Sequence, residues 1–215
     1  MRIEPGSKLV LIGDSITDCD REFPVGEAIN NGLGNGYVNL VNALLTATYP
    51  DQHIRIVNMG TGGNTVLDLA ARWNSDVLAQ KPDWLSVMIG INDVWRQFDS
   101  PLHPEWHVPL ETYKNTLEDL VRKTRPQLKG LILISPYLIE PNHSEPMRAM
   151  MDTYGQTVRA LAEKYDAIFV DAQAAFDIVM KDLHPMSLAW DRVHPGLAGH
   201  AVIARAFLSA IEYKW

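Results

Sequence analysis

Short apolar runs alternate along the chain with longer segments in which apolar residues recur every three or four positions. The short runs are rich in β-branched residues and are followed by Gly, Asn, Asp or Pro, which is typical of buried strands that end in loops. They predict five strands, at Lys8–Ile12, Ile54–Asn58, Trp84–Ile89, Leu131–Ser135 and Ala167–Val170.

The longer segments have the spacing of amphipathic helices. In the last of them, apolar residues step by four and three from Leu197 to Ile211, which places them on one face. Helices are predicted at Tyr37–Thr48, Thr65–Gln80, Leu110–Thr124, Met147–Tyr165, Ala172–Lys181 and Leu197–Tyr213. Because strands that alternate with helices form right-handed crossovers, we expect a three-layer α/β/α sandwich with a five-stranded, mostly parallel sheet.

Composition and charge remove several classes of function. The 215 residues fit a single domain over residues 1–215. Apolar residues make up 47 % and charged residues 21 %, a balance that excludes disordered and fibrous proteins. The formal net charge is −7, and such a negative field repels phosphate backbones and anionic lipids. We therefore expect neither nucleic acid nor a membrane as a partner.

The single cysteine, Cys19, excludes an internal disulfide and a cysteine-based zinc site. The first residues lack the basic and apolar stretches of a secretory signal, and no run approaches the ~20 apolar residues of a membrane span. A cytoplasmic location is therefore expected. His103, Glu105 and His107 form the one arrangement that suggests a metal, but neighbouring prolines break any helix that would present them together, so we expect no metal site.

Irregular stretches are predicted at Asp18–Gly36, Gln97–Pro109 and Pro136–Pro146, and loops of this length in a compact domain are usually functional. In open parallel sheets the ligand site lies beyond the carboxyl ends of the strands. The residues that follow each strand are therefore the ones to search for chemistry.

Polar motifs stand at these positions. Gly13-Asp14-Ser15 follows the first strand, a glycine-rich segment from Asn58 to Thr65 follows the second, and Gly90-Ile91-Asn92-Asp93 follows the third. Asp191-Arg192-Val193-His194 stands before the last helix. Each motif alone has a structural interpretation as a helix cap or a turn. Together they supply a nucleophile, a base, an orienting carboxylate and oxyanion donors at one edge of the sheet.

Ser15 is the candidate nucleophile and His194 its base, because a serine hydroxyl needs a base and histidine titrates near neutral pH. Asp191 lies three residues before His194, within reach of its Nδ1, and would fix the tautomer that leaves Nε2 unprotonated. Three groups are candidate oxyanion donors: the Ser15 N–H, the Gly63 N–H and the Asn92 side-chain amide.

Four further residues flank the candidates. Trp95 and Trp190 lie within three residues of Asn92 and Asp191, and two interpretations stay open, a wall of the substrate site or a place in the core. Asp14 and Asp93 are expected to hydrogen-bond to loop backbone and to hold the oxyanion donors in place.

Trp106 and Trp215 are candidate apolar anchors of a homo-oligomer, or they are buried.

On these motifs the chain resembles the SGNH hydrolases, the GDSL esterase and lipase superfamily, which is named for Ser, Gly, Asn and His in separate blocks. Gly13-Asp14-Ser15-Ile16 matches the first block, with isoleucine in place of leucine. Gly63 fits the second block, although neighbouring glycines leave its alignment open by a few residues. Gly90-Ile91-Asn92-Asp93 and Asp191-x-x-His194 match the two later blocks.

The segments Gln80–Trp84 and Ala189–His194 also resemble a bacterial subgroup that includes intracellular acetyl-xylan esterases, and the likeness covers nearly the whole chain. The resemblance implies a flavodoxin-like sandwich and hydrolysis through an acyl-serine without metal or cofactor. It implies acetylated xylo-oligosaccharides as substrates.

Other functions stay open. A broad carboxylesterase, a lysophospholipase or a thioesterase would carry the same four blocks. A nonenzymatic module that binds phosphate at Gly60–Gly63 lacks the Walker and dinucleotide-binding spacings. The α/β-hydrolase fold would need a Gly-x-Ser-x-Gly elbow, which does not surround Ser15.

Overall fold

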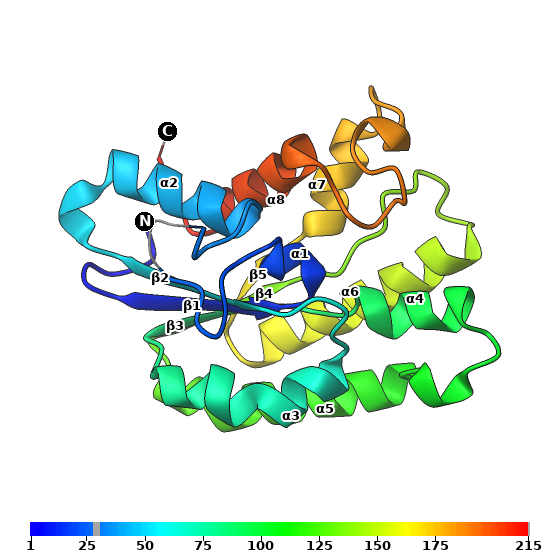
Figure 1. Cartoon of the computed structure of the whole chain (residues 1–215), viewed down its shortest axis with the longest axis horizontal. Helices are drawn as coiled ribbons and strands as arrows, with labels where there is room; N and C mark the ends of the chain where they lie inside the picture. Colours follow the sequence, from blue (N-terminus) through cyan, green and yellow to red (C-terminus); the bar gives the residue numbers. More distant parts are fainter. Residues whose placement is uncertain (28–30, 215) are drawn as a thin grey trace.

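The computed structural model describes residues 1–27 and 31–214, which form one sheet between two layers of helices (Figure 1). The strand order is β2-β1-β3-β4-β5, and neighbouring strands pair in parallel. The strands are β1 (Lys8–Gly13), β2 (Arg55–Gly60), β3 (Trp84–Met88), β4 (Gly130–Ile134) and β5 (Ile168–Val170). The predicted fold class is confirmed, with a sheet in which all five strands are parallel.

The strand register brings the carboxyl ends of three strands level with one another. Gly13 at the end of β1 pairs with Gly60 of β2 and with Met88 of β3. A Cβ at Gly60 would lie 2.1 Å from the backbone nitrogen of Asp18, so only glycine allows β2 to end against the segment that follows β1. The residues that follow these three strands therefore meet at one edge of the sheet.

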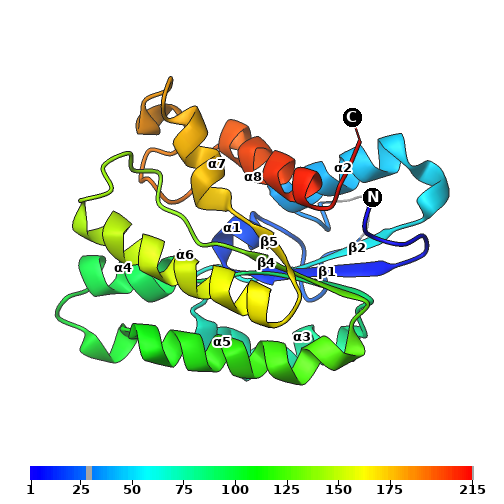
Figure 2. The same cartoon turned by 180° about the vertical axis from the view of Figure 1, so that it is seen from behind.

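Two sets of helices cover the two faces of the sheet (Figures 1 and 2). One face carries α2 (Tyr37–Thr48), α7 (Ala172–Val179) and α8 (Leu197–Ala210). The other carries α3 (Val66–Asp76), α5 (Leu110–Thr124) and α6 (Pro146–Lys164). The short helix α1 (Ser15–Asp18) follows β1, and 3-10 helices occur at Pro50–Gln52, Leu78–Gln80, Pro104–Trp106, Arg125–Gln127 and Pro185–Ser187.

Helix α4 (Ile91–Asp99) is the longest helix that the sequence does not predict; the short helix α1 and the 3-10 helices were not predicted either. Its segment begins with Gly90-Ile91-Asn92-Asp93, which has the composition of a turn, yet it forms a helix because Ile91 and Val94 share one face and are buried in the core. The predicted irregular stretch from Gln97 therefore begins inside a helix. The predicted stretch 18–36 lies partly outside the described residues.

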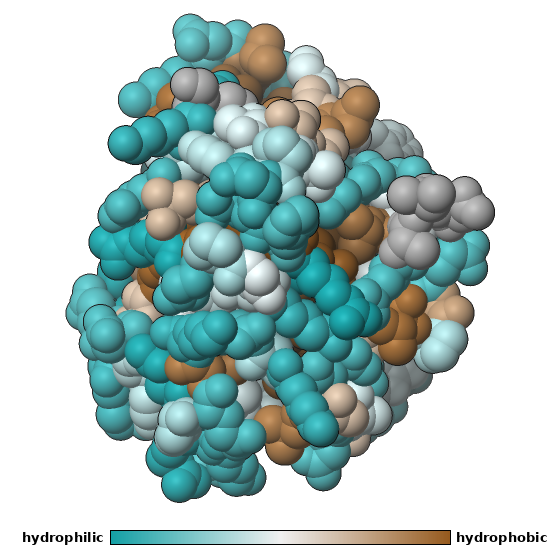
Figure 3. All heavy atoms as spheres, turned by 90° about the vertical axis from the view of Figure 1, so that its left-hand side faces the viewer, coloured by the Kyte–Doolittle hydropathy of each residue, from teal (hydrophilic) through white to brown (hydrophobic). Residues whose placement is uncertain are grey.

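The end of the molecule at the amino ends of the strands faces the reader in Figure 3 and is mainly hydrophilic, with small, separated hydrophobic areas. The predicted site residues belong to the other end, where β1 runs into α1. Within residues 1–27 and 31–214, no helix combines the length and apolar character that crossing a bilayer requires.

Candidate active site

Three side chains from distant parts of the sequence form a hydrogen-bonded row at the carboxyl edge of the sheet. The Oγ of Ser15, at the start of α1, lies 2.9 Å from Nε2 of His194. The Nδ1 of His194 lies 2.7 Å from Oδ2 of Asp191. A carboxylate only accepts, so Nδ1 carries the proton and Nε2 is left to accept from the serine hydroxyl. The row can therefore move a proton from Ser15 to the imidazole.

Asp191 is fixed and kept charged by its neighbours. Its Oδ1 accepts hydrogen bonds from the backbone N–H groups of Val193 at 2.9 Å and His194 at 2.8 Å. Burial alone would raise the pKa of Asp191, but the hydrogen bonds from the His194 ring and from these two N–H groups hold it below its ordinary value. A charged carboxylate in this position stabilises the imidazolium that forms when the histidine takes a proton.

The glycine-rich loop after β2 passes beside Ser15. A Cβ on Gly62 would lie 4.0 Å from the Cβ of Ser15, and the Gly62 N–H donates to Oδ2 of Asp18 at 2.9 Å. Gly63 has a φ of +77°, and its N–H makes no hydrogen bond within the described part of the chain. Gly63 is therefore the glycine of this pair whose N–H can still donate to a bound oxygen, and Asp18 is a support that the sequence does not single out.

Asn92 is attached to the same loop from the side of α4. It is buried, and its Nδ2 donates to the carbonyl of Asn64 at 2.9 Å, which leaves the second N–H of the amide for a ligand. The Nη2 of Arg96 donates to its Oδ1 at 3.4 Å, which assigns the opposite end of the amide as the donor. The candidate oxyanion donors on Gly63 and Asn92 thus belong to one connected group.

Two buried acids support this arrangement. Asp14 caps α1, since its Oδ1 accepts from the N–H of Ile16 at 3.0 Å, and Asp93 accepts from the N–H of Val66 at 3.0 Å. Burial raises the pKa of Asp14 and of Asp93 to about 7 in each case. Both carboxyl groups bind loop or helix-start backbone, which agrees with the supporting role predicted for them.

Arg72 of α3 ties the end of β1 to the end of β2 and to the glycine-rich loop that follows it, and sequence reasoning missed Arg72. Its Nη2 donates to the carbonyl of Gly13 at 2.8 Å, its Nη1 to the carbonyl of Met59 at 2.7 Å, and its Nε to Oδ1 of Asn64 at 2.6 Å. In the sequence Arg72 stands four residues before Asp76, a common pattern on exposed helix faces, so no local signal distinguishes it.

The two flanking tryptophans differ in their surroundings. Trp95 is half-buried, and its ring centroid lies 5.8 Å from that of His194 with the planes at 61°. Trp190 is 84 % exposed, which excludes a place in the core. In the described ranges, no group of three or more His, Cys, Asp or Glu side chains is placed to hold a metal ion.

Comparison with known proteins assigns the class. The family model of the GDSL-like lipase/acylhydrolase family matches residues 11–202, and the chain belongs to this family. It is a carboxylic ester hydrolase. An acetylxylan esterase from Geobacillus stearothermophilus is 56 % identical over 215 residues, which are 100 % of this chain and 98 % of the relative.

Solved structures agree with this assignment. The crystal structure of Axe2, an acetylxylan esterase from Geobacillus stearothermophilus, covers 100 % of this chain and 98 % of its own at 56 % identity and a TM-score of 0.99. That of LAE5, an α/β hydrolase enzyme from the metagenome of Lake Arreo in Spain, covers 99 % of this chain and 98 % of its own at 54 % identity and a TM-score of 0.97. The predicted family, fold and enzyme class are confirmed.

Proposed function

We propose that this chain removes acetyl groups from xylo-oligosaccharides through an acyl-enzyme on Ser15. The observation that carries the chemistry is the row formed by Ser15, His194 and Asp191. The substrate class is supported by the similarity to Axe2, which is described as an acetyl-xylooligosaccharide esterase. Variants of Axe2 described as catalytic mutants replace a serine, a histidine and an aspartate that are numbered 15, 194 and 191.

The geometry supports a two-step hydrolysis. In the first step the Oγ of Ser15 attacks the ester carbonyl carbon while Nε2 of His194 takes the hydroxyl proton. The N–H groups of Ser15 and Gly63 and the amide of Asn92 receive the oxyanion, and each such donor is typically worth about 10²–10³ in rate. The C–O bond to the sugar then breaks, and His194 gives its proton to the departing sugar oxygen.

The second step returns the enzyme to its starting state. Water attacks the acetyl group on Ser15 while His194 accepts a proton from it, and collapse of the new tetrahedral species releases acetate and restores the serine hydroxyl. Asp191 stays charged throughout and holds the imidazole in place. No cofactor takes part in the proposed reaction.

The substrate preference is assigned to the two tryptophans. The exposed indole of Trp190 offers an apolar face next to Asp191 on which a sugar ring can stack. Trp95, which lies edge-on to His194, limits the space for the acyl chain and so favours acetate. A short oligosaccharide also suits the predicted cytoplasmic location, because a polymer cannot enter a cell intact.

The test combines labelling with substrate profiles. A fluorophosphonate should add once to the wild type and to Ser209→Ala, an exposed serine variant on α8, but not to Ser15→Ala, as read by intact mass. Hydrolysis should be faster for p-nitrophenyl acetate than for the octanoate, and acetylated xylo-oligosaccharides should release acetate.

Each contrary result has a meaning. A folded wild type with neither adduct nor turnover would favour the nonenzymatic module that binds phosphate at the glycine-rich loop. A preference for octanoate would favour the lysophospholipase or broad carboxylesterase.

The homo-oligomer stays a prediction. Trp106 is 51 % exposed, with one side of its ring stacked on His103 at a centroid distance of 4.1 Å, whereas Trp215 lies outside the described residues. Light scattering of the wild type and of Trp106→Ser tests it, and a monomer mass for the wild type would reject it.

A further inference from the structure

The segment that carries the proposed base belongs to no helix or strand, yet its backbone is held in an unusual conformation. Arg192, between Asp191 and His194, has a φ of +66°, a left-handed conformation that is uncommon for arginine and costs free energy. Hydrogen bonds from the N–H groups of Val193 and His194 to Asp191 close this turn from within, but they do not fix its place relative to Ser15, which contacts from outside the segment must set.

The contacts that hold it come from the segment 136–145, which follows β4. The backbone N–H of Ile139 donates to the carbonyl of Arg192 at 2.9 Å, and the hydroxyl of Tyr137 donates to the carbonyl of Val193 at 3.3 Å. The Nη1 of Arg192 also lies 2.9 Å from Oε2 of Glu140, and both side chains are partly shielded from water. Arg192 thus contacts the segment 136–145 through both its main-chain carbonyl and its side chain.

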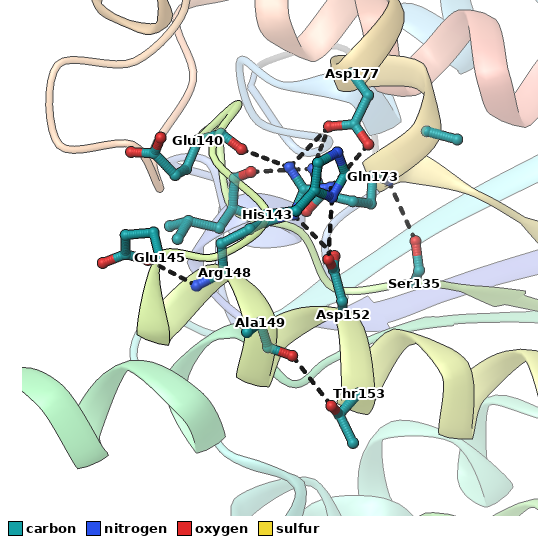
Figure 4. A network of polar contacts seen from close by, with 12 residues as sticks. Ser135, Glu140, His143, Glu145, Arg148, Ala149, Asp152, Thr153, Gln173 and Asp177 are labelled. Carbon is teal, nitrogen blue, oxygen red and sulfur yellow. Dashed lines mark hydrogen bonds and ion pairs between the residues drawn. The ribbon is translucent and has the colours of Figure 1, made fainter.

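Glu140 is in turn anchored to a buried arginine (Figure 4). The side chain of Arg148 is 1 % exposed, and its Nη1 donates to the backbone carbonyl of Glu140. Two hydrogen bonds, at 2.9 and 2.8 Å, join its guanidinium to the carboxylate of Asp177, and Nε donates to Asp152 at 2.8 Å. Asp152 of α6 and Asp177 of α7 both hold this guanidinium, so the backbone of Glu140 is fixed and its carboxylate has a defined position.

We infer that Arg192 is a positioning residue, whose ion pair with Glu140 holds the Asp191–His194 segment so that the imidazole stays within reach of Ser15. The inference rests on the proposed function and deepens it. Without the pair the Arg192 side chain no longer ties the Asp191–His194 segment to the segment 136–145, and the imidazole leaves the serine for part of the time. Misplacement of a catalytic group by about 1 Å can cost on the order of a hundredfold in rate.

The first test separates positioning from substrate binding. Arg192→Ala and Glu140→Gln should each lower kcat by about tenfold to a hundredfold while KM changes by less than about twofold. The loss should be the same for p-nitrophenyl acetate and for an acetylated xylo-oligosaccharide, and fluorophosphonate labelling of Ser15 should slow in parallel. Arg192→Lys should recover part of the rate because it keeps the charge.

Two further variants test the ion pair itself. The double variant Arg192→Ala with Glu140→Gln should be no slower than Arg192→Ala, because both substitutions break the pair with Glu140 and Arg192→Ala alone already removes the longer contact with Glu145 at 3.8 Å. Arg192→Gly should stay as slow as Arg192→Ala, although glycine adopts a φ of +66° without strain. Arg122→Ala, which removes an exposed ion pair with Asp119 on α5, is the matched control and should keep the wild-type rate.

The contrary outcomes are distinct. A wild-type kcat in Arg192→Ala would overturn the inference. A slow Arg192→Ala beside a wild-type rate in Arg192→Gly would also overturn it, because backbone strain at residue 192 would then explain the loss. A rise in KM for the oligosaccharide alone would make Arg192 a substrate contact and would also overturn it. If Arg192→Ala does not fold, Glu140→Gln decides by the same criteria. A wild type that neither labels nor turns over would instead reject the proposed function.

Discussion

Ser15 is held by the strand that it follows, whereas His194 is held by side chains and loops that surround it. Gly13, two residues before Ser15, pairs with the strands on both sides, and Arg72 and Asp14 bind the backbone nearby. His194 is exposed, lies on an irregular segment, and depends on contacts from the segment 136–145. The two proposed partners in proton transfer are therefore only 2.9 Å apart but belong to differently built regions.

Because the two regions are held differently, we expect substitutions in them to affect the free energy of unfolding and the rate to different extents. Changes around Ser15 disturb buried backbone hydrogen bonds in the centre of the sheet, so they should lower the free energy of unfolding. Changes around His194 disturb exposed or half-exposed contacts, so they should lower the rate and leave the stability almost intact.

The largest effect is expected when either partner is removed. Ser15→Ala and His194→Ala should each lower kcat for p-nitrophenyl acetate by about 10⁴-fold or more, and the double variant should be no slower, because the two groups act as a unit. The melting temperature of each variant should stay close to that of the wild type, because neither substitution breaks a backbone hydrogen bond of the sheet. Additive losses in the double variant would mean that the two regions contribute separately.

A smaller loss is expected at the oxyanion donor that α4 supplies. Asn92→Ala should lower kcat by about 10²–10³ with a modest loss of stability, since it also removes the bond to the Asn64 carbonyl. Gln127→Ala is the control, because it removes a side-chain bond to the Lys123 carbonyl just before the amino end of β4. Near-normal turnover in Asn92→Ala would remove this residue from the proposed oxyanion hole.

The contrast in stability can be measured directly by urea unfolding. Arg72→Met should lower the free energy of unfolding by about 2–4 kcal/mol, because it removes the guanidinium donors to the carbonyls of Gly13 and Met59 and leaves the Gly13 carbonyl with the Thr61 N–H alone. Arg192→Ala should lower it by less than about 1 kcal/mol, as is usual for partly exposed ion pairs. Equal losses of unfolding free energy in the two variants would show that the regions around Ser15 and His194 do not differ in this way.

The smallest effect is expected at His200 of α8, the helix that follows the proposed base His194. His200 of α8 accepts a hydrogen bond from the N–H of Tyr37 at 3.2 Å, and burial lowers the pKa of His200 to about 4. The unfolded chain takes up this proton below its ordinary pKa of 6.5, so stability from His200 is present above that value and is lost as the pH falls. Between about pH 8 and 5.5 the wild type should lose about 1 kcal/mol more than His200→Gln.

The raised pKa values of Asp14 and Asp93 act in the opposite direction. These acids add stability as the pH falls through about 7, but they are present in both proteins and cancel in the comparison. Urea unfolding at the two pH values measures the difference, and an equal drop in both proteins would contradict the assignment to His200.

The sequence predicted the strands, most helices and the meeting of Ser15, Asp191 and His194, because strand ends in a parallel sheet share one edge. It missed α4, whose first residues have the composition of a turn. It could not find Arg72, Arg148 or Arg192 as supports, because the contacts that make them supports go to other elements, and the i,i+4 ion pairs of Arg72 and Arg148 are common on helix surfaces. The sequence could not predict that Trp190 is exposed, because an irregular segment has no periodic pattern that separates buried from exposed positions.

The hydrogen bond between Ser15 and His194 spans 179 residues of sequence, with consequences for the time at which activity begins. During synthesis the chain would complete its nucleophile, its glycine-rich loop and its sheet before the ribosome reached His194. On the proposed mechanism, such an unfinished chain contains Ser15 without its base and leaves esters intact. Hydrolysis would start only after the segment before α8 had been made and had docked, so enzyme activity reports that nearly the whole chain has been synthesised and folded.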